Sequence, residues 1–191
     1  MLSGQDVWVF GYGSLMWRPG FQYLEQRAAT LHGYHRSFCI YSHHHRGTPD
    51  NPGLVLGLDT GGSCVGCAFL IQAKNVADVI AYLNERELIG YAYTPRIIDV
   101  TLKDGKEAEN ITVPSYTYVA DLSHEHYAGS LPIAEAARLI MNAEGIAGLN
   151  RDYLINTVRH LEQTGFAEPE LHALLRDVEA RTGMIDIGGG I

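Results

Sequence analysis

The order of the expected secondary structure constrains the fold of this chain more than any other feature of its sequence. Strand-like segments separated by Gly, Pro, Asn and Asp fill most of the first two-thirds, whereas the last third has the apolar spacing of helices. A chain in which strands come first and helices follow favours an α+β domain over a doubly wound one. We therefore interpret residues 1–182 as one α+β domain and residues 183–191 as a flexible Gly-rich C-terminal tail.

The strands that we expect are short apolar runs bounded by turn-forming residues. They cover residues 7–10, 37–41, 54–56, 65–71, 96–102 and 111–119. Asp104-Gly105 lies between the last two runs and predicts a hairpin. Pro114 has no backbone N–H to donate, so it indicates an edge strand or a bulge in the second arm of that hairpin.

The helices that we expect follow from apolar residues at helical spacing. They cover residues 76–88, 133–144, 151–164 and 168–181. Asn75, with Asp78 three residues later, resembles a capping arrangement for the first of them. Asn150 and Glu168-Pro169 are typical of helix starts and predict where the last two begin.

Charge and composition exclude several classes of function. The 14 basic and 22 acidic residues give a net charge of -8 without a basic block, so we expect neither nucleic acid nor a membrane surface as a partner. The three cysteines cannot all pair with one another, and no signal peptide is recognisable, which predicts a cytoplasmic protein. The longest apolar run, residues 65–71, is too short to span a bilayer.

A glycine-containing loop directly after the first expected strand is the first candidate site. Its sequence is Gly11-Tyr12-Gly13-Ser14-Leu15-Met16. Glycines there let the backbone turn tightly, and successive N–H groups can then point at an anion or a developing oxyanion. Met16 stands where a dinucleotide-binding fingerprint needs a third Gly, so that motif is excluded. The alternative is a plain strand-to-loop turn.

Glu87 is the second candidate, because it follows apolar residues of the expected helix at spacings of four, seven and eleven: Leu83, Ile80 and Val76. This spacing places its carboxylate on the apolar face, near the C-terminal end of the helix. Burial and the negative end of the helix dipole both raise the pKa of such a carboxyl, which suits a base that takes a proton from an amine. The alternatives are exposure at a fraying helix end or a salt bridge with Arg86, Arg96 or Arg46.

Histidines and cysteines form patterns that favour no chemistry of their own. The histidines at positions 43–45, 124 and 126 have no carboxylate or cysteine at a recognisable zinc spacing, so we interpret them as loop or surface residues and expect no metal. Cys64 and Cys67 resemble a redox pair, but in a strand residues i and i+3 point to opposite faces and cannot bridge.

Five segments, in order from residue 8 to about 180, resemble the ChaC-type γ-glutamylcyclotransferases. They are Trp8-Val9-Phe10-Gly11-Tyr12-Gly13-Ser14-Leu15-Met16-Trp17, His45-Arg46-Gly47-Thr48-Pro49 with Pro52-Gly53, Tyr82-Leu83-Asn84-Glu85-Arg86-Glu87 with Gly90-Tyr91, Tyr127-Ala128-Gly129, and Gly145-Ile146-Ala147-Gly148-Leu149-Asn150-Arg151-Asp152-Tyr153-Leu154. The three consecutive histidines before Arg46 and the longer Gly-rich tail depart from the family pattern.

The resemblance implies a small mixed β-barrel surrounded by helices. It also implies cofactor-free release of 5-oxoproline from a small γ-glutamyl substrate, with glutathione giving 5-oxoproline and Cys-Gly. By the same resemblance Tyr12, Gly13, Ser14 and Leu15 would hold the γ-glutamyl group, Glu87 would be the catalytic glutamate, and Tyr127 would lie near the substrate.

Two other functions stay open at this point. One is a cyclotransferase of the same chemistry that acts on other γ-glutamyl dipeptides or amines. The other is a non-catalytic regulatory module associated with cation transport, which would need a partner surface rather than Glu87. The sequence leaves the oligomeric state open.

Overall fold

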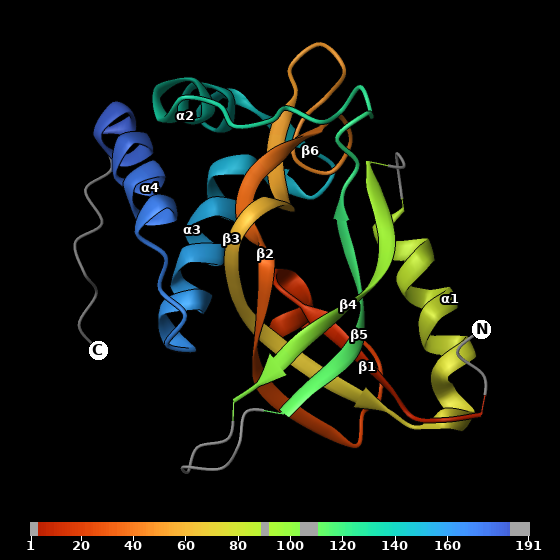
Figure 1. Ribbon diagram of the computed structural model, residues 1–191. Coiled ribbons are helices and arrows are strands. Elements are labelled where there is room, and N and C mark those ends of the chain that lie inside the picture. The colour runs from red at the N-terminus through yellow and green to blue at the C-terminus, as the bar shows by residue number, and fades with distance from the viewer. Residues whose placement is uncertain (1–3, 89–91, 104–110, 184–191) are drawn as a thin grey trace. The chain divides into compact units, whose positions relative to one another are not determined.

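A computed structural model describes residues 4–88, 92–103 and 111–183 of the chain (Figure 1). The chain divides into two compact units, Met1–Ser37 with Leu56–Tyr127 as the first and Phe38–Val55 with Ala128–Ile191 as the second. The expected single domain over residues 1–182 stays a prediction. Of the expected tail, residues 184–191 lie outside the described residues.

Five strands form a closed barrel in the order β1-β3-β2-β4-β5 (Figure 1). Their bounds are β1 Val7–Gly11, β2 Glu25–Ser42, β3 Gly53–Ile71, β4 Tyr93–Leu102 and β5 Ile111–Ala120. The β1–β3 pair is antiparallel, whereas β1 and β5 pair in parallel through Trp8 with Ser115 and Val9 with Tyr116. This short parallel ladder closes the barrel and makes it mixed, as expected.

Strands β2 and β3 are much longer than the sequence indicates. β2 begins at Glu25 rather than at residue 37, and β3 joins the two expected runs 54–56 and 65–71 into one strand. Gly61 and Gly62 lie inside β3 with φ values of 94° and 68°, in the left-handed region that favours glycine. The expected break there was wrong, because the glycines redirect the backbone without ending the strand.

The β4–β5 hairpin is confirmed, with a continuous register from Tyr93 opposite Ala120 to Leu102 opposite Ile111. Asp104-Gly105, on which the prediction rests, lies outside the described residues. The interpretation of Pro114 was wrong. β5 lies between β4 and β1 rather than at an edge, and the register with β4 passes Pro114 without a bulge. The parallel ladder with β1 begins one residue later, at Ser115, so no N–H is required of Pro114 on that side.

Helix α1, Val76–Glu87, lies beside the barrel in Figure 1 and buries Val76, Val79 and Leu83. It ends one residue before the predicted end. The expected cap was wrong in its mechanism: Asn75 occupies the N-cap position, but its side chain makes no capping hydrogen bond. A single 3-10 turn, Ala73–Asn75, leads into the helix instead.

The second unit contains three helices that pack on one another: α2 Ile133–Asn142, α3 Asn150–Gln163 and α4 Pro169–Thr182. All three were expected, and Pro169 begins α4 at the position where proline is favoured. Two unpredicted two-residue strands, β6 Glu144–Gly145 and β7 Gly148–Leu149, connect α2 to α3 and end α2 two residues early. No helix within the described residues is long and apolar enough to cross a membrane.

Candidate active site

The glycine loop leaves the barrel at the end of β1 and forms one 3-10 turn, Ser14–Met16. Gly13 is the N-cap of this turn, and the N–H of Met16 donates to its carbonyl at 2.9 Å. A helical turn leaves its first N–H groups without internal partners, and here these belong to Ser14 and Leu15. A Cβ on Gly11 would lie 2.9 Å from the Cβ of Leu15, so the tight return of the chain requires glycine there.

A buried arginine on β2 supports this loop. Arg36 donates from Nε to the carbonyl of Tyr12 and from Nη2 to the carbonyl of Val65 at 2.7 Å. Only 2% of Arg36 is exposed, so these carbonyls replace the water that its charge would otherwise need. Sequence reasoning missed Arg36, although its alternation with buried Phe38 and Ile40 along one strand points to a buried position.

Glu87 is the last residue of α1, and 23% of its side chain is exposed. Burial raises the pKa of this carboxyl, while the guanidinium of Arg86 opposes the rise. The Nε of Arg86 lies 3.2 Å from Oε1 of Glu87 as an ion pair. The predicted direction of the pKa shift is therefore confirmed, and Arg86 is the salt-bridge partner among the three arginines considered.

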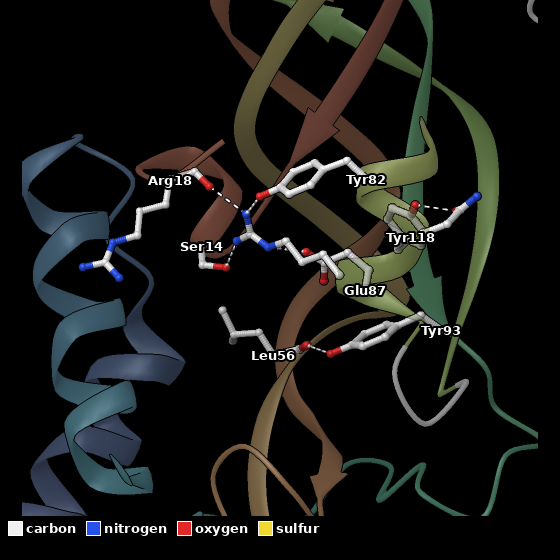
Figure 2. Close-up of polar contacts among 9 residues, drawn as sticks. Ser14, Arg18, Leu56, Tyr82, Glu87, Tyr93 and Tyr118 are labelled. Carbon is white, nitrogen blue, oxygen red and sulfur yellow. Dashed lines mark hydrogen bonds and ion pairs between the residues drawn. The ribbon is translucent and has the colours of Figure 1, made fainter. Parts of the chain in front are cut away.

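Arg86 joins the end of α1 to the glycine loop. Its Nη2 donates to Oγ of Ser14 at 2.7 Å, and its Nη1 donates to the carbonyl of Arg18 at 2.8 Å and to the hydroxyl of Tyr82 at 3.1 Å. Dashed lines in Figure 2 connect one guanidinium to these three labelled residues, with Glu87 beside it. The two segments that the sequence singled out, the loop and the helix end, are thus brought together.

Two tyrosines of β5 hold the last turns of α1 from another side. The hydroxyls of Tyr116 and Tyr118 both donate to Oδ1 of Asn84, at 3.0 and 2.7 Å, three residues before Glu87. Burial raises the pKa of Tyr118 far above its usual value, and the neighbouring Tyr116 and Glu87 add to the rise. Tyr118 therefore stays a neutral hydroxyl that donates to Asn84 near the end of α1.

The remaining predicted residues lie in defined surroundings. Tyr12 and Leu15 are buried, and the hydroxyl of Tyr127 donates to the buried carboxylate of Asp59 at 2.8 Å. The place of Tyr127 beside a substrate stays a prediction. Among the described residues, no group of three or more metal-ligating side chains lies close enough together to hold an ion. Cys39, Cys64 and Cys67 are buried, and burial raises the pKa of the Cys67 thiol.

Two further motifs of the sequence meet inside the second unit. The guanidinium of Arg46 donates to the carbonyls of Ala147 and Leu149, at 2.6 and 3.2 Å, and lies 5.2 Å from the ring centre of Tyr153. Asn150 is fully buried and forms two 2.7 Å hydrogen bonds with the backbone N–H and C=O of Leu54. These contacts account for the second and fifth motifs as structural features.

A family model described as ChaC-like protein matches residues 7–181. The chain belongs to the ChaC-like family. The predicted family is thereby confirmed. Among curated relatives, the glutathione-specific γ-glutamylcyclotransferase of Escherichia coli is 34% identical over 91% of this chain and 73% of its own length. The human glutathione-specific γ-glutamylcyclotransferase 1 is 32% identical over 84% of this chain and 72% of its own.

Solved structures share the fold of this chain. A crystal structure of a glutathione-specific γ-glutamylcyclotransferase from yeast superimposes with a TM-score of 0.80 at 25% identity, and the match covers 93% of this chain and 97% of that one. The expected α+β fold with a small barrel is therefore confirmed for this ChaC-like protein.

Proposed function

We propose that this ChaC-like protein is a γ-glutamylcyclotransferase that cleaves glutathione into 5-oxoproline and Cys-Gly. The observation that carries the proposal is a half-buried carboxyl of raised pKa, Glu87, connected through Arg86 to the glycine loop. The names of the relatives from Escherichia coli and human support glutathione as the substrate.

The reaction needs a base. The α-amino group of the γ-glutamyl residue is an ammonium that must lose a proton before its nitrogen can attack the γ-carbonyl carbon. Glu87 takes this proton, and its raised pKa makes it a stronger base than an exposed glutamate. Because attack closes a five-membered ring, holding the chain in a curled conformation supplies most of the orientation.

Negative charge then develops on the γ-carbonyl oxygen. The amides of Ser14 and Leu15, at the start of the 3-10 turn, are the donors that would stabilise it, with Tyr12 and Gly13 completing the cradle. Loss of one such donor typically costs about 3–4 kcal/mol of transition-state stabilisation. As the bond between the γ-carbon and the cysteine nitrogen breaks, Glu87 returns its proton to that leaving amine. The regenerated carboxylate then takes the second proton from the new ring nitrogen, which leaves a neutral lactam, and passes it to the amino group of Cys-Gly. One carboxyl serves as base and then as acid.

Substitution of Glu87 by glutamine tests the proposal directly. Glutamine has nearly the same shape but cannot accept the proton, so we expect turnover to fall by about 1,000-fold, within the range for general base catalysis. Purified protein is incubated with reduced glutathione, and 5-oxoproline and Cys-Gly are quantified by mass spectrometry. Glu85→Gln, an exposed change of the same kind two residues earlier, is the matched control and keeps wild-type turnover.

The outcomes separate the alternatives. Equal amounts of both products from wild type, and almost none from Glu87→Gln, support both the substrate and the base. Wild-type turnover by Glu87→Gln contradicts the mechanism. If the wild-type protein is inactive on glutathione but active on other γ-glutamyl dipeptides or amines, the proposed chemistry stands and the proposed substrate is wrong. Inactivity on the whole panel favours the regulatory module.

A further inference from the structure

We propose that Arg86 is a positioning residue that clamps the last turn of α1 to the Ser14–Met16 turn, so that the Glu87 carboxylate and the loop amides meet the substrate as one rigid group. The inference rests on the proposed function, because it assigns the geometry on which base and oxyanion donors depend. It goes further in naming the side chain that sets this geometry.

The contacts of Arg86 join segments that are distant in the sequence. Its guanidinium binds Ser14 Oγ and the Arg18 carbonyl on one side, and Tyr82 and Glu87 of its own helix on the other. The Ser14 and Arg18 contacts span 72 and 68 residues of sequence. A rigid planar fork with several N–H groups can serve such separated acceptors, whereas the single ammonium of lysine cannot.

The geometry also differs from that of an ordinary surface ion pair. Neighbouring residues of a helix point in directions that do not face each other, so Arg86 and Glu87 gain nothing from helical spacing alone. The side chain of Arg86 is turned toward the loop, where its Nη donors are used, and its Nε approaches Oε1 of Glu87 at 3.2 Å. The cation therefore stands next to the base while its hydrogen bonds are directed mainly to the loop and to Tyr82.

A structural clamp and a positioning residue predict different effects on the titration of Glu87. Among the described residues, Arg86 from α1 is the charged group that lowers the pKa of this carboxyl, while Tyr118 from β5 is neutral because its pKa is far above the physiological range. Arg86 is then the cation that offsets the burial of Glu87. Its removal raises the pKa of Glu87 further and moves the acidic limb of the pH–rate profile to higher pH.

The test uses Arg86→Gln and Arg86→Lys, with Arg96→Gln as a matched control. Arg96 is exposed on β4, so its substitution makes the same change of charge outside the clamp. For Arg86→Gln we expect kcat to fall about 100-fold, the loss that a misplacement near 1 Å produces, together with a shift of the acidic limb to higher pH. Arg86→Lys keeps the charge but loses the fork, so the limb stays in place while kcat still falls about 10-fold.

Each outcome decides the proposal. Arg86→Gln with wild-type kcat and an unmoved acidic limb overturns it, even if the melting temperature falls, because that pattern belongs to a purely structural clamp. If Arg86→Lys has the wild-type kcat, the proposed clamp is overturned, because the positive charge of Arg86 then suffices without its forked hydrogen bonds. If Arg86→Gln does not fold, Arg86→Lys alone decides through kcat.

A direct titration keeps this test separate from that of the proposed function. The carboxyl carbon of Glu87 is followed by 13C NMR in wild type and in Arg86→Gln, without substrate. We expect a higher pKa in the variant, and an unchanged pKa overturns the electrostatic part of the proposal. A wild-type protein that is inactive on every γ-glutamyl compound overturns the proposed function instead, whatever the titration shows.

Discussion

Each unit of the molecule contains a polar side chain that joins two distant segments, and the two side chains differ in charge, burial and partners. Asn150 in the second unit is fully buried and binds both backbone groups of Leu54. Arg86 in the first unit has 24% of its side chain exposed and binds a hydroxyl, a carbonyl, a phenol and a carboxylate.

The difference separates a structural junction from a functional one. A neutral amide with backbone partners has the same hydrogen bonds at every physiological pH, and its buried position makes each of them costly to lose. A half-buried cation beside a carboxyl contributes less to stability but controls protonation of its neighbour. We therefore expect substitutions at Asn150 to act on folding and substitutions around Arg86 to act on catalysis.

The largest effect on stability is expected from Asn150→Ala. The variant leaves the buried N–H and C=O of Leu54 without their partner, at about 1–3 kcal/mol for each group, so the free energy of unfolding falls by roughly 2–6 kcal/mol. Urea denaturation followed by circular dichroism measures the change. Asn142→Ala removes an exposed side chain near the end of α2 and is the control, with an effect within about 0.5 kcal/mol. If Asn150→Ala lowers the free energy of unfolding by less than about 1 kcal/mol, Asn150 is not the structural junction that the comparison with Arg86 requires.

A smaller effect, on catalysis rather than stability, is expected from Ser14→Ala. It removes the acceptor of one hydrogen bond from a charged donor, worth about 1.5–3 kcal/mol, so kcat/KM falls by about 10- to 150-fold. Steady-state kinetics with glutathione measure it, with the exposed Ser123→Ala as control. A loss as deep as that of Glu87→Gln would instead assign Ser14 a direct catalytic role.

The smallest effect concerns the free energy of unfolding, which the ionised Glu87 lowers at neutral pH. Because its folded pKa is raised above the ordinary 4.5, the ionised carboxylate is disfavoured in the folded state, and stability declines as pH rises through the folded pKa. Glu87→Gln removes this penalty, so we expect higher stability than wild type at neutral pH and no gain well below pH 4.5. Urea denaturation at the two pH values measures it. Destabilisation at neutral pH would mean that the ion pair with Arg86 outweighs burial.

Local patterns in the sequence predicted the features that depend on neighbouring residues. The four helices, the β4–β5 hairpin and the apolar-face position of Glu87 all follow from short-range periodicity. The length of β2 and β3 did not, because Gly33 and Gly61-Gly62 resemble breaks, although a long barrel strand accommodates them at positive φ. The closed barrel itself came only from the family resemblance.

In the candidate site too, the sequence predicted the residues with a local signal and missed those whose partners lie far away along the chain. Glu87 and the glycine loop were found because each has a recognisable local setting. Arg36, Asn84 and Tyr118 were missed, since their importance lies in partners that are far away along the chain. Arg86 was found only as an alternative, as a salt-bridge partner of Glu87, and its contact with Ser14 had no local signal.

The short parallel ladder between β1 and β5 has a consequence for how the chain folds during synthesis. β1 and the glycine loop leave the ribosome early, but the lateral partners of β1 are residues 67–71 of β3 and residues 115–116 of β5. Until those residues emerge, the apolar run Val7–Phe10 has no strand to pair with and is open to aggregation or chaperone binding. β3 offers the first partner before α1 is made, whereas the β5 partner that closes the barrel beside β1 and the glycine loop emerges only after α1 and its glutamate.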